Sequence, residues 1–468
     1  MKWLRYWSLF LVYFFTVQHL VGQVKLLTLE NTLDIVRVHH PIAKQATLRV
    51  DASQAFLLSS RGNFDPSYYL RNDRKTFDGK NYFNNTISEI KIPTWYGIDL
   101  SAGIENNQGV RPDPTLTVGR STYVGVSIPV LRGLLMDRRR AAVMQSKKMV
   151  SLSIQEKWMM LNDLLYQSAT AYWSWVAAHQ TRKVFQQAVA VAERRFQFVK
   201  LSYLSGDRAA IDTTEALSQL QSMQTMESQA WLALQEKRLE LSNYMWNDNG
   251  QPYELPEEIE PDSTWNTVAI PNYPIPNLNE SILKAETEHP KLVAFDFRRE
   301  VLQIEKRLNV QELLPSLNLR YNFLRQDFGL NKLLVAPLFE NNYKFGIQFG
   351  VPLFQREARG NLRSTNIKLN EVDLSLQQTR LEILNKVRAS FSEVNAYQTQ
   401  VTIFQSNTEN QRLLLKAEES RFSVGESSMF LVNARENNLI AANQKLIDLK
   451  AKFFKSIIGV QWAMGQLR

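Results

Sequence analysis

The chain has 468 residues, 44% hydrophobic and 22% charged, so it carries enough apolar material for a large core and is not of disordered composition. It contains no cysteine, which excludes disulfides and thiolate metal sites. The net charge of +9 is spread among acidic residues, which favours a solvated surface over a nucleic-acid-binding patch.

The N-terminus has the pattern of a secretory signal. Lys2 and Arg5 supply the positive region, and residues 8–16 form an almost unbroken apolar run before a plausible cleavage point after Gly22. A retained anchor helix is the alternative, but the apolar run is shorter than the roughly 20 residues that a spanning helix needs. The sequence therefore predicts a signal peptide over 1–22 and an exported protein.

The mature chain repeats itself. His40-Pro41 recurs as His289-Pro290, and Pro66-Ser67-x-x-Leu70-Arg71 recurs as Pro315-Ser316-x-x-Leu319-Arg320. Two matches at the same shift of 249 residues indicate a duplicated architecture. We expect a first repeat over 23–250, a proline-rich linker over 251–277 and a second repeat over 278–468.

Each half carries a short region of alternating apolar and polar residues. The clearest cases are Val124, Val126 and Ile128 in the first half, and 316–323 and 344–351 in the second. One apolar and one polar face over about ten residues is typical of a transmembrane β-strand, although a half-buried soluble sheet has the same pattern. The prediction is one strand hairpin per half, at about 64–129 and 314–354, with the first carrying a 75–117 insertion of undetermined structure.

Four strands cannot close a barrel wide enough for transport. Lipid-exposed sheet edges are not tolerated, because unpaired backbone groups find no water there. If these strands lie in a bilayer, several copies must therefore share one barrel. Tyr68, Tyr69, Tyr321 and Tyr343 are candidate interfacial aromatics, with core packing as the alternative.

Long helices follow each strand region, at about 133–247 and 357–460. Residues 130–251 and 353–468 contain no proline, and Gly206 is the only glycine between Gly133 and Gly250. Apolar residues recur every seven positions near the C-terminus, which predicts left-handed supercoiled packing. They are Val432, Leu439, Leu446, Phe453 and Val460.

Sequence motifs for catalysis and metal binding were sought and not found. The chain has no Gly-x-Ser-x-Gly, no Gly-x-x-x-x-Gly-Lys and no His-Glu-x-x-His, and its five histidines have no metal-ligand spacing. We predict no enzyme activity, no metal and no cofactor.

Taken together, the sequence resembles the TolC-type outer membrane efflux family. The resemblance rests on the duplicated opening segments, on Ile128-Pro129-Val130-Leu131-Arg132-Gly133 with its partner Val351-Pro352-Leu353-Phe354, and on Arg421-Phe422-Ser423-Val424-Gly425. It implies a mainly α fold with a small transmembrane β part, forming as a homotrimer a twelve-stranded β-barrel continuous with an α-helical barrel.

The resemblance also implies a function and partners. The chain would be the outer-membrane exit duct of a tripartite efflux or type I secretion system, with its helices in the periplasm. Expected partners are a periplasmic adaptor (membrane fusion) protein, an inner-membrane transporter of RND or ABC type and outer-membrane lipid, with no nucleic acid. The competing interpretation is an exported coiled-coil scaffold or adaptor.

The family resemblance places a gated entrance and adaptor-docking region at two glycine elements, 204–216 and 424–435. Gly206 and Gly425 mark them, and Asp212 matches an acid that helps to hold the entrance shut in known members. Ser427, Leu431 and Ala434 stand where members carry an arginine and two acids. Met429, Phe430 and Leu431 instead suggest an apolar constriction that closes by dewetting, unless they simply pack between helices.

A basic run, Asp137-Arg138-Arg139-Arg140, begins the first long helix. We expect it at the inner rim of the membrane, either meeting lipid phosphates or forming an ordinary solvated rim.

Overall fold

The computed structural model describes residues 26–266, 268–326 and 342–468, so the predicted signal peptide lies outside the described residues. The chain divides into two compact units. The first combines Met1–Lys44, Leu161–Ile282 and Lys386–Arg468, and the second combines Gln45–Met160 and Leu283–Asn385. Two long helices, α4 (Arg138–Leu204) and α9 (Arg356–Ser423), run from one unit into the other.

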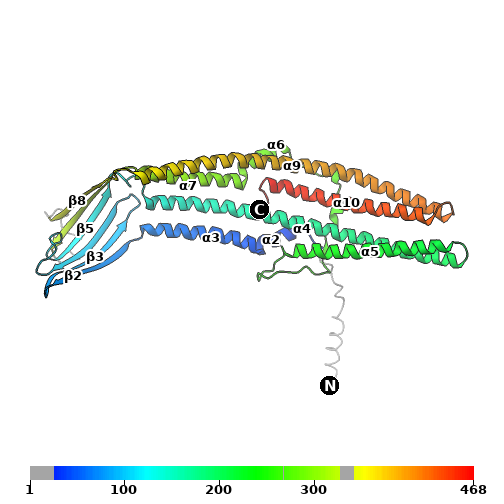
Figure 1. Cartoon of the computed structure of the whole chain (residues 1–468), viewed down its shortest axis with the longest axis horizontal. Coiled ribbons are helices and arrows are strands. Elements are labelled where there is room, and N and C mark those ends of the chain that lie inside the picture. The colour runs from blue at the N-terminus through cyan, green and yellow to red at the C-terminus, as the bar shows by residue number, and fades with distance from the viewer. Residues whose placement is uncertain (1–25, 267, 327–341) are drawn as a thin grey trace, which may run out of the picture. The chain divides into compact units, whose positions relative to one another are not determined.

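The second unit holds a six-stranded antiparallel sheet and the helices that follow from one of its ends (Figure 1). The end of the sheet next to the helices is called the inner end below. Its strands are β2 (Ser67–Phe77), β3 (Lys80–Pro93), β4 (Asp99–Gln108), β5 (Gly119–Pro129), β7 (Ser316–Gln326) and β8 (Tyr343–Gly350). They lie in the order β2-β3-β4-β5-β7-β8, so β5 of the first repeat pairs directly with β7 of the second.

The expected hairpin is present in the second half, as β7–β8. In the first half the insertion, whose structure the sequence left open between additional strands and an outer loop, adds two strands, so the chain has six described strands in this sheet instead of four. Segments that match in the two repeats fall in β2 and β7, and in β5 and β8. The first-half insertion forms β3 and β4 between β2 and β5. Its residues alternate less clearly because polar side chains such as Ser88 and Asn106 interrupt the apolar face.

Helices beside the sheet pack through small hydroxyl and amide side chains. These helices are α3 (Pro41–Arg61), α7 (Pro290–Glu312) and the first parts of α4 and α9. The hydroxyl groups of Ser60 and Ser146 lie 2.7 Å apart, joining α3 to α4, and Asn309 donates to Thr365 across 2.9 Å, joining α7 to α9. Because these side chains are small, the helices can lie close together without a wide stripe of apolar residues between them.

The first unit contains α2 (Leu29–His39), α5 (Ala210–Ser242), α10 (Met429–Ala463) and the far parts of α4 and α9. β1 (Leu26–Leu27) pairs in parallel with β6 (Glu260–Pro261) of the inter-repeat segment. A buried aromatic group joins α4, the inter-repeat segment and α10: Trp173 stacks on Phe454 at 4.5 Å, and Trp265 packs edge-on against both rings. Helix α6 (Leu278–Glu288) begins in this unit.

Burial sets up a pH-dependent contribution to stability at His179 of α4. Desolvation, together with the nearby Lys183, lowers the pKa of His179 from 6.5 to about 4, although Glu260 lies 4.0 Å away. The folded state therefore favours neutral imidazole. Its stabilising contribution is complete above pH 6.5 and is lost as the pH falls toward 4.

We expect acidification through this window to lower the free energy of unfolding by up to about 3 kcal/mol through His179 alone. Denaturant midpoints measured between pH 7 and pH 4 should fall less steeply in His179→Gln than in the parent chain. Parallel pH profiles for the two proteins would contradict the assignment.

Over the part of the chain that the structure describes, no helix combines the length and apolar character needed to cross a bilayer.

Candidate functional site

The sheet has two chemically distinct faces. Residues directly opposite each other in antiparallel strands share a face, so the strand register assigns every side chain. One face, called the apolar face below, carries Tyr68, Leu70, Ile90, Ile92, Leu100, Ile104, Val124, Val126, Ile128, Leu317, Leu319, Tyr321, Phe323, Tyr343, Phe345, Ile347 and Phe349. The other, called the polar face, carries Arg71, Asp73, Glu89, Lys91, Glu105, Asn107, Ser127, Asn318, Arg320, Lys344 and Gln348.

The apolar face is unusually exposed. Phe345 is 52% exposed, Ile347 62% and Phe349 64% in the single chain. Apolar side chains on this face are also exposed on β2, β3, β4 and β5, whereas those of β7 are half-buried. So many exposed apolar side chains on one face mark a surface that contacts lipid or another protein. Three of the four predicted interfacial tyrosines lie on it, whereas Tyr69 lies on the polar face beneath the ammonium of Lys91.

The polar face is packed in places as tightly as a core. A Cβ on Gly103 would lie 2.7 Å from the ring of Tyr123, and one on Gly125 would overlap the amide oxygen of Asn322. Glycine at these two positions lets large side chains from the neighbouring strands lie flat across the sheet. The alternating pattern in the sequence shows the two faces but not these close contacts.

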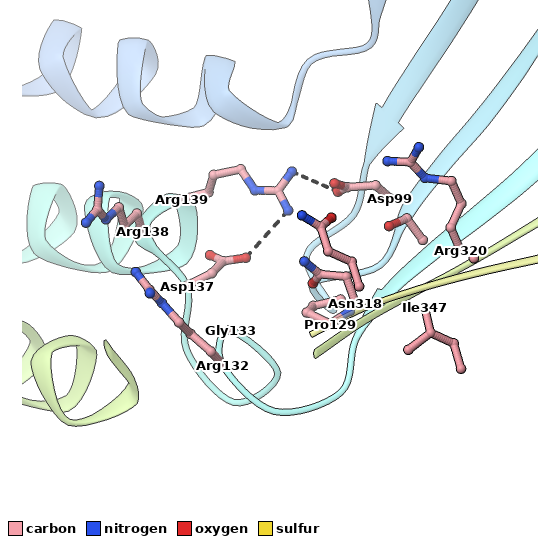
Figure 2. A pocket seen from close by; sticks show the side chains of 14 residues that line it. Asp99, Pro129, Arg132, Gly133, Asp137, Arg138, Arg139, Asn318, Arg320 and Ile347 are labelled. Atoms are coloured by element: carbon pink, nitrogen blue, oxygen red, sulfur yellow. Dashed lines mark hydrogen bonds and ion pairs between the residues drawn. The ribbon is translucent and has the colours of Figure 1, made fainter. Parts of the chain in front are cut away.

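A pocket of about 490 Å³ lies at the inner end of the sheet, where β4, β5, β7 and β8 meet the start of α4 (Figure 2). Arg139 reaches from α4 to Asp99 at 2.8 Å and to Asp137 at 3.6 Å. Asp137 also caps α4 by accepting from the backbone N–H of Arg140 at 2.8 Å.

The remaining members of the basic run are also engaged. Arg138 pairs with Glu312 of α7 at 2.7 Å, and the buried Arg140 donates to the carbonyl of Gly133. The run Arg138-Arg139-Arg140 therefore ties the strands to the helices through carboxylates and a carbonyl. With these partners inside the chain, the arginines are not a free cluster for binding phosphate.

The two glycine elements form matching turns at the far ends of the long helices. Gly206 (φ 80°) lies between α4 and α5, and Gly425 (φ 82°) lies between α9 and α10. Both need the left-handed conformation that glycine adopts without strain. The guanidinium of Arg208 lies 4.0 Å from the ring of Phe422 and donates to its carbonyl at 3.1 Å, so the turns are neighbours.

The residues suggested for an apolar constriction differ in burial. Met429 is fully buried among Val199, Ala216, Phe422 and Val432, as the packing alternative expects. Phe430 and Leu431, by contrast, are 68% and 43% exposed.

The other predicted entrance residues have different surroundings. Ser427 donates its hydroxyl to Glu418 at 2.5 Å, and the half-buried Asp212 lies in the first turn of α5. Ala434 is half-buried in the second turn of α10.

Two ionic clusters near these turns were not foreseen. The guanidinium of Arg195 on α4 forms two hydrogen bonds to the carboxylate of Glu436 on α10, at 2.6 and 3.2 Å, and one to Glu419 on α9, at 3.3 Å. Glu418, 7% exposed, contacts Arg421 at 3.7 Å and Arg435 at 3.9 Å. The sequence signal was present, because Glu436 falls four residues after Val432 on the buried side of α10.

Across residues 26–266, 268–326 and 342–468, no group of three or more histidines and carboxylates is arranged to hold a metal ion.

Comparison with known proteins identifies the family. The family model for outer membrane efflux proteins matches residues 98–245 and 282–466, which is more than half of the chain. The chain belongs to the outer membrane efflux protein family. The resemblance that the sequence alone suggested is thereby confirmed, and the two matched segments fall one in each repeat of this efflux-family chain.

Curated relatives are similar over part of their length. TolC of Salmonella enteritidis is 25% identical over 203 residues, covering 41% of this chain and 40% of TolC. TolC of Escherichia coli is 26% identical over 132 residues, 26% of this chain and 25% of TolC. The matches thus span less than half of each TolC.

Solved structures share the fold over nearly the whole chain. The CmeC outer membrane channel of Campylobacter jejuni superposes with a TM-score of 0.64 at 15% identity, covering 94% of this chain and 85% of CmeC. CusC gives 0.67 at 14% identity, with 93% and 91% covered. The MtrE outer membrane channel of Neisseria gonorrhoeae gives 0.67 at 13% identity, with 94% and 89% covered.

Proposed function

We propose that this chain is the outer-membrane exit channel of a tripartite efflux or type I secretion system. The observation that carries the proposal is the two-faced sheet: one face is mainly apolar, with exposed apolar side chains on β2, β3, β4, β5 and β8, and the other is mainly polar and charged. An apolar face against lipid and a polar face around an aqueous lumen is the arrangement of a transmembrane β-barrel.

The sheet edges make the proposal an oligomeric one. Among the described residues of one chain, β2 and β8 each pair on one side only. A lipid-exposed edge leaves backbone groups without hydrogen bonds, so β8 of one copy must pair with β2 of the next. All neighbours along β2-β3-β4-β5-β7-β8 are antiparallel, so β2 and β8 run in opposite directions. The β8 strand of one copy can therefore pair with β2 of the next as another antiparallel pair. Three copies, the number usual in this family, would close a barrel of eighteen strands rather than twelve.

The helices and partners follow from this orientation. The strands lie in the outer membrane, and the four long helices extend into the periplasm, where three copies form a helical tunnel. The turns around Gly206 and Gly425 are then the tunnel entrance and the docking region for a periplasmic adaptor. An inner-membrane transporter of RND or ABC type delivers the cargo.

At the entrance, the exposed side chains of Phe430 and Leu431 favour an apolar constriction, to which the buried Met429 does not contribute. Asp212, Ser427 and Ala434 are the neighbouring entrance residues in this proposal. Replacing Leu431 by serine should raise single-channel conductance in planar bilayers, because a hydroxyl disfavours dewetting. Leu217→Ser on the exposed side of α5 is the matched control, and unchanged conductance in Leu431→Ser would contradict an apolar gate.

Fractionation and detergent gels test the function as a whole. The mature chain should sediment with outer membranes, migrate as a trimer in mild detergent and open ion-conducting channels after reconstitution. A protein released in soluble form would instead support an exported coiled-coil scaffold. Affinity capture from membranes should bring down an adaptor and a transporter.

A further inference from the structure

The segment between β4 and β5 folds back over the polar face of the sheet instead of extending away from it. After Gln108 the chain first continues along β3, where the N–H groups of Val110 and Arg111 donate to the carbonyls of Asn81 and Tyr82 at 3.1 and 2.8 Å. It then turns at Asp113 and returns to β5 at Gly119. This segment, residues 109–118, is called the β4–β5 loop below.

Two polar-face side chains hold the loop. The amide of Asn107 donates to the carbonyl of Asp113 at 3.0 Å and accepts from its N–H at 3.3 Å. Lys344 lies on β8, three strands away from the β4 strand that carries Asn107, and donates to the carbonyl of Thr115 at 2.8 Å. The carboxylate of Asp113 accepts from the N–H and the hydroxyl of Thr115 at 2.8 and 2.7 Å, which fixes the turn internally.

Polar side chains on this face are covered where the loop lies. Asn107 is 0% exposed, Asn85 opposite it is 6% exposed, and Glu105 and Ser121 are 8% and 1% exposed. Near the inner end, beyond the reach of the β4–β5 loop, the polar-face residues Arg320 and Gln348 are exposed, although Gly97 and Gly133 of the neighbouring turns line the same pocket. Because Asn107 and Lys344 both point from the polar face to the loop, the loop lies on the lumen side of the sheet.

We propose that the β4–β5 loop is a built-in constriction at the outer end of the channel, which limits the cargo to small solutes. The inference rests on the proposed function, since only then is the polar face a lumen. Each copy contributes one loop, so an oligomer narrows its own mouth from every side. Lys344 acts as a positioning residue that keeps the loop across the face.

The cysteine-free chain allows a direct test by thiol labelling. The reporter substitution is Gln348→Cys, on the polar face of β8 at the inner end of the sheet. Intact cells producing this variant receive, from outside, either a small charged maleimide that does not cross membranes or a maleimide on a bulky poly(ethylene glycol). Gel shifts of the protein measure labelling, and this readout does not depend on whether the helical entrance is open.

The comparison variants carry the same reporter substitution. In one, Gly109–Thr117 is replaced by Asn-Gly, which joins Gln108 to Val118 through a two-residue hairpin turn without changing the β4–β5 register. In another, Lys344→Ala removes the hydrogen bond to Thr115 together with the attraction of the ammonium to Asp113 of the loop and to Glu105. Lys91→Ala is the matched control, because Lys91 lies on the same face and pairs with Glu89 instead of the loop.

The small reagent should label the introduced thiol in every variant, and the bulky reagent should label it only in the loop-replaced chain and, more slowly, in Lys344→Ala. Labelling by the bulky reagent when the loop and Lys344 are both intact would overturn the inference, as would exclusion of that reagent from both loop variants. If the loop-replaced chain fails to assemble, the proposal is tested by comparing how fast the bulky reagent labels Lys344→Ala and Lys91→Ala. Failure of the small reagent would instead show that the polar face is not an aqueous lumen, and the proposed function itself would fall.

Discussion

Ile347→Lys should prevent the chain from accumulating as a folded oligomer in outer membranes, whereas Gln348→Lys should not. The two residues are neighbours on β8, toward the inner end of the sheet, and both are exposed in the single chain. They differ in face: Ile347 lies on the apolar face, opposite Leu319, and Gln348 lies on the polar face, opposite Asn318. A lysine facing lipid costs up to about 2–4 kcal/mol per chain, less as its position approaches the interface, and every copy in the barrel would bear that cost.

Heat-modifiable migration on gels and the yield in outer-membrane fractions measure the effect. Because the substitutions introduce the same side chain at adjacent positions, a general effect of positive charge or of strand propensity affects both equally. Equal yields would mean that the apolar face does not contact lipid. A loss in Gln348→Lys alone would reverse the assignment of the two faces.

Glu436→Gln should loosen the helical end of the chain. The side chains of Arg195 and Glu436 are only 13% and 6% exposed, and their two hydrogen bonds join α4 to α10. Removing one partner of a buried ion pair leaves the other charge desolvated, which costs about 3–5 kcal/mol. We expect the lower end of that range, because Glu419 still pairs with Arg195 at 3.3 Å. The assembled channel should therefore open more readily at its entrance.

Thermal unfolding in detergent and single-channel conductance are the measurements. Glu409→Gln is the matched control, since Glu409 and Arg412 form an exposed pair one turn apart on α9, and such pairs contribute little. A lower Tm with unchanged conductance would assign Arg195 and Glu436 a purely structural role. No change in either property would mean that the ion pair does not restrain the helices.

Much of the architecture was accessible from local rules. Helices α4 and α9 lie within the two proline-free stretches, and both turns fall at the glycines whose positive φ requires that residue. The alternating residues of β5, β7 and β8 stood out because one side of each strand must be apolar throughout. These features depend on residues that are close together in the sequence, so they could be predicted from the sequence alone.

Features that depend on distant contacts were missed. β3 and β4 contain Asn84, Asn85, Asn106 and Asn107, which obscure the period of two, and only pairing with β2 and β5 makes them strands. At the helical end, the apolar character of Met429 suggested either a gate or packing between helices, and its side chain at the start of α10 is buried in the core. Glu418 and Glu436 resemble ordinary helix-surface acids until the fold brings Arg195 and Arg435 beside them.

The first-half insertion has two opposing consequences for a pore. Because barrel diameter grows roughly in proportion to strand number, the added hairpin β3–β4 would give the proposed three-copy barrel about one and a half times the bore that four strands per copy would give. The segment that follows β4 occupies part of the space so gained. Under the proposed function, enlargement and obstruction are thus encoded in one contiguous stretch, residues 80–118, and deleting it would exchange a wide, partly blocked pore for a narrow, open one.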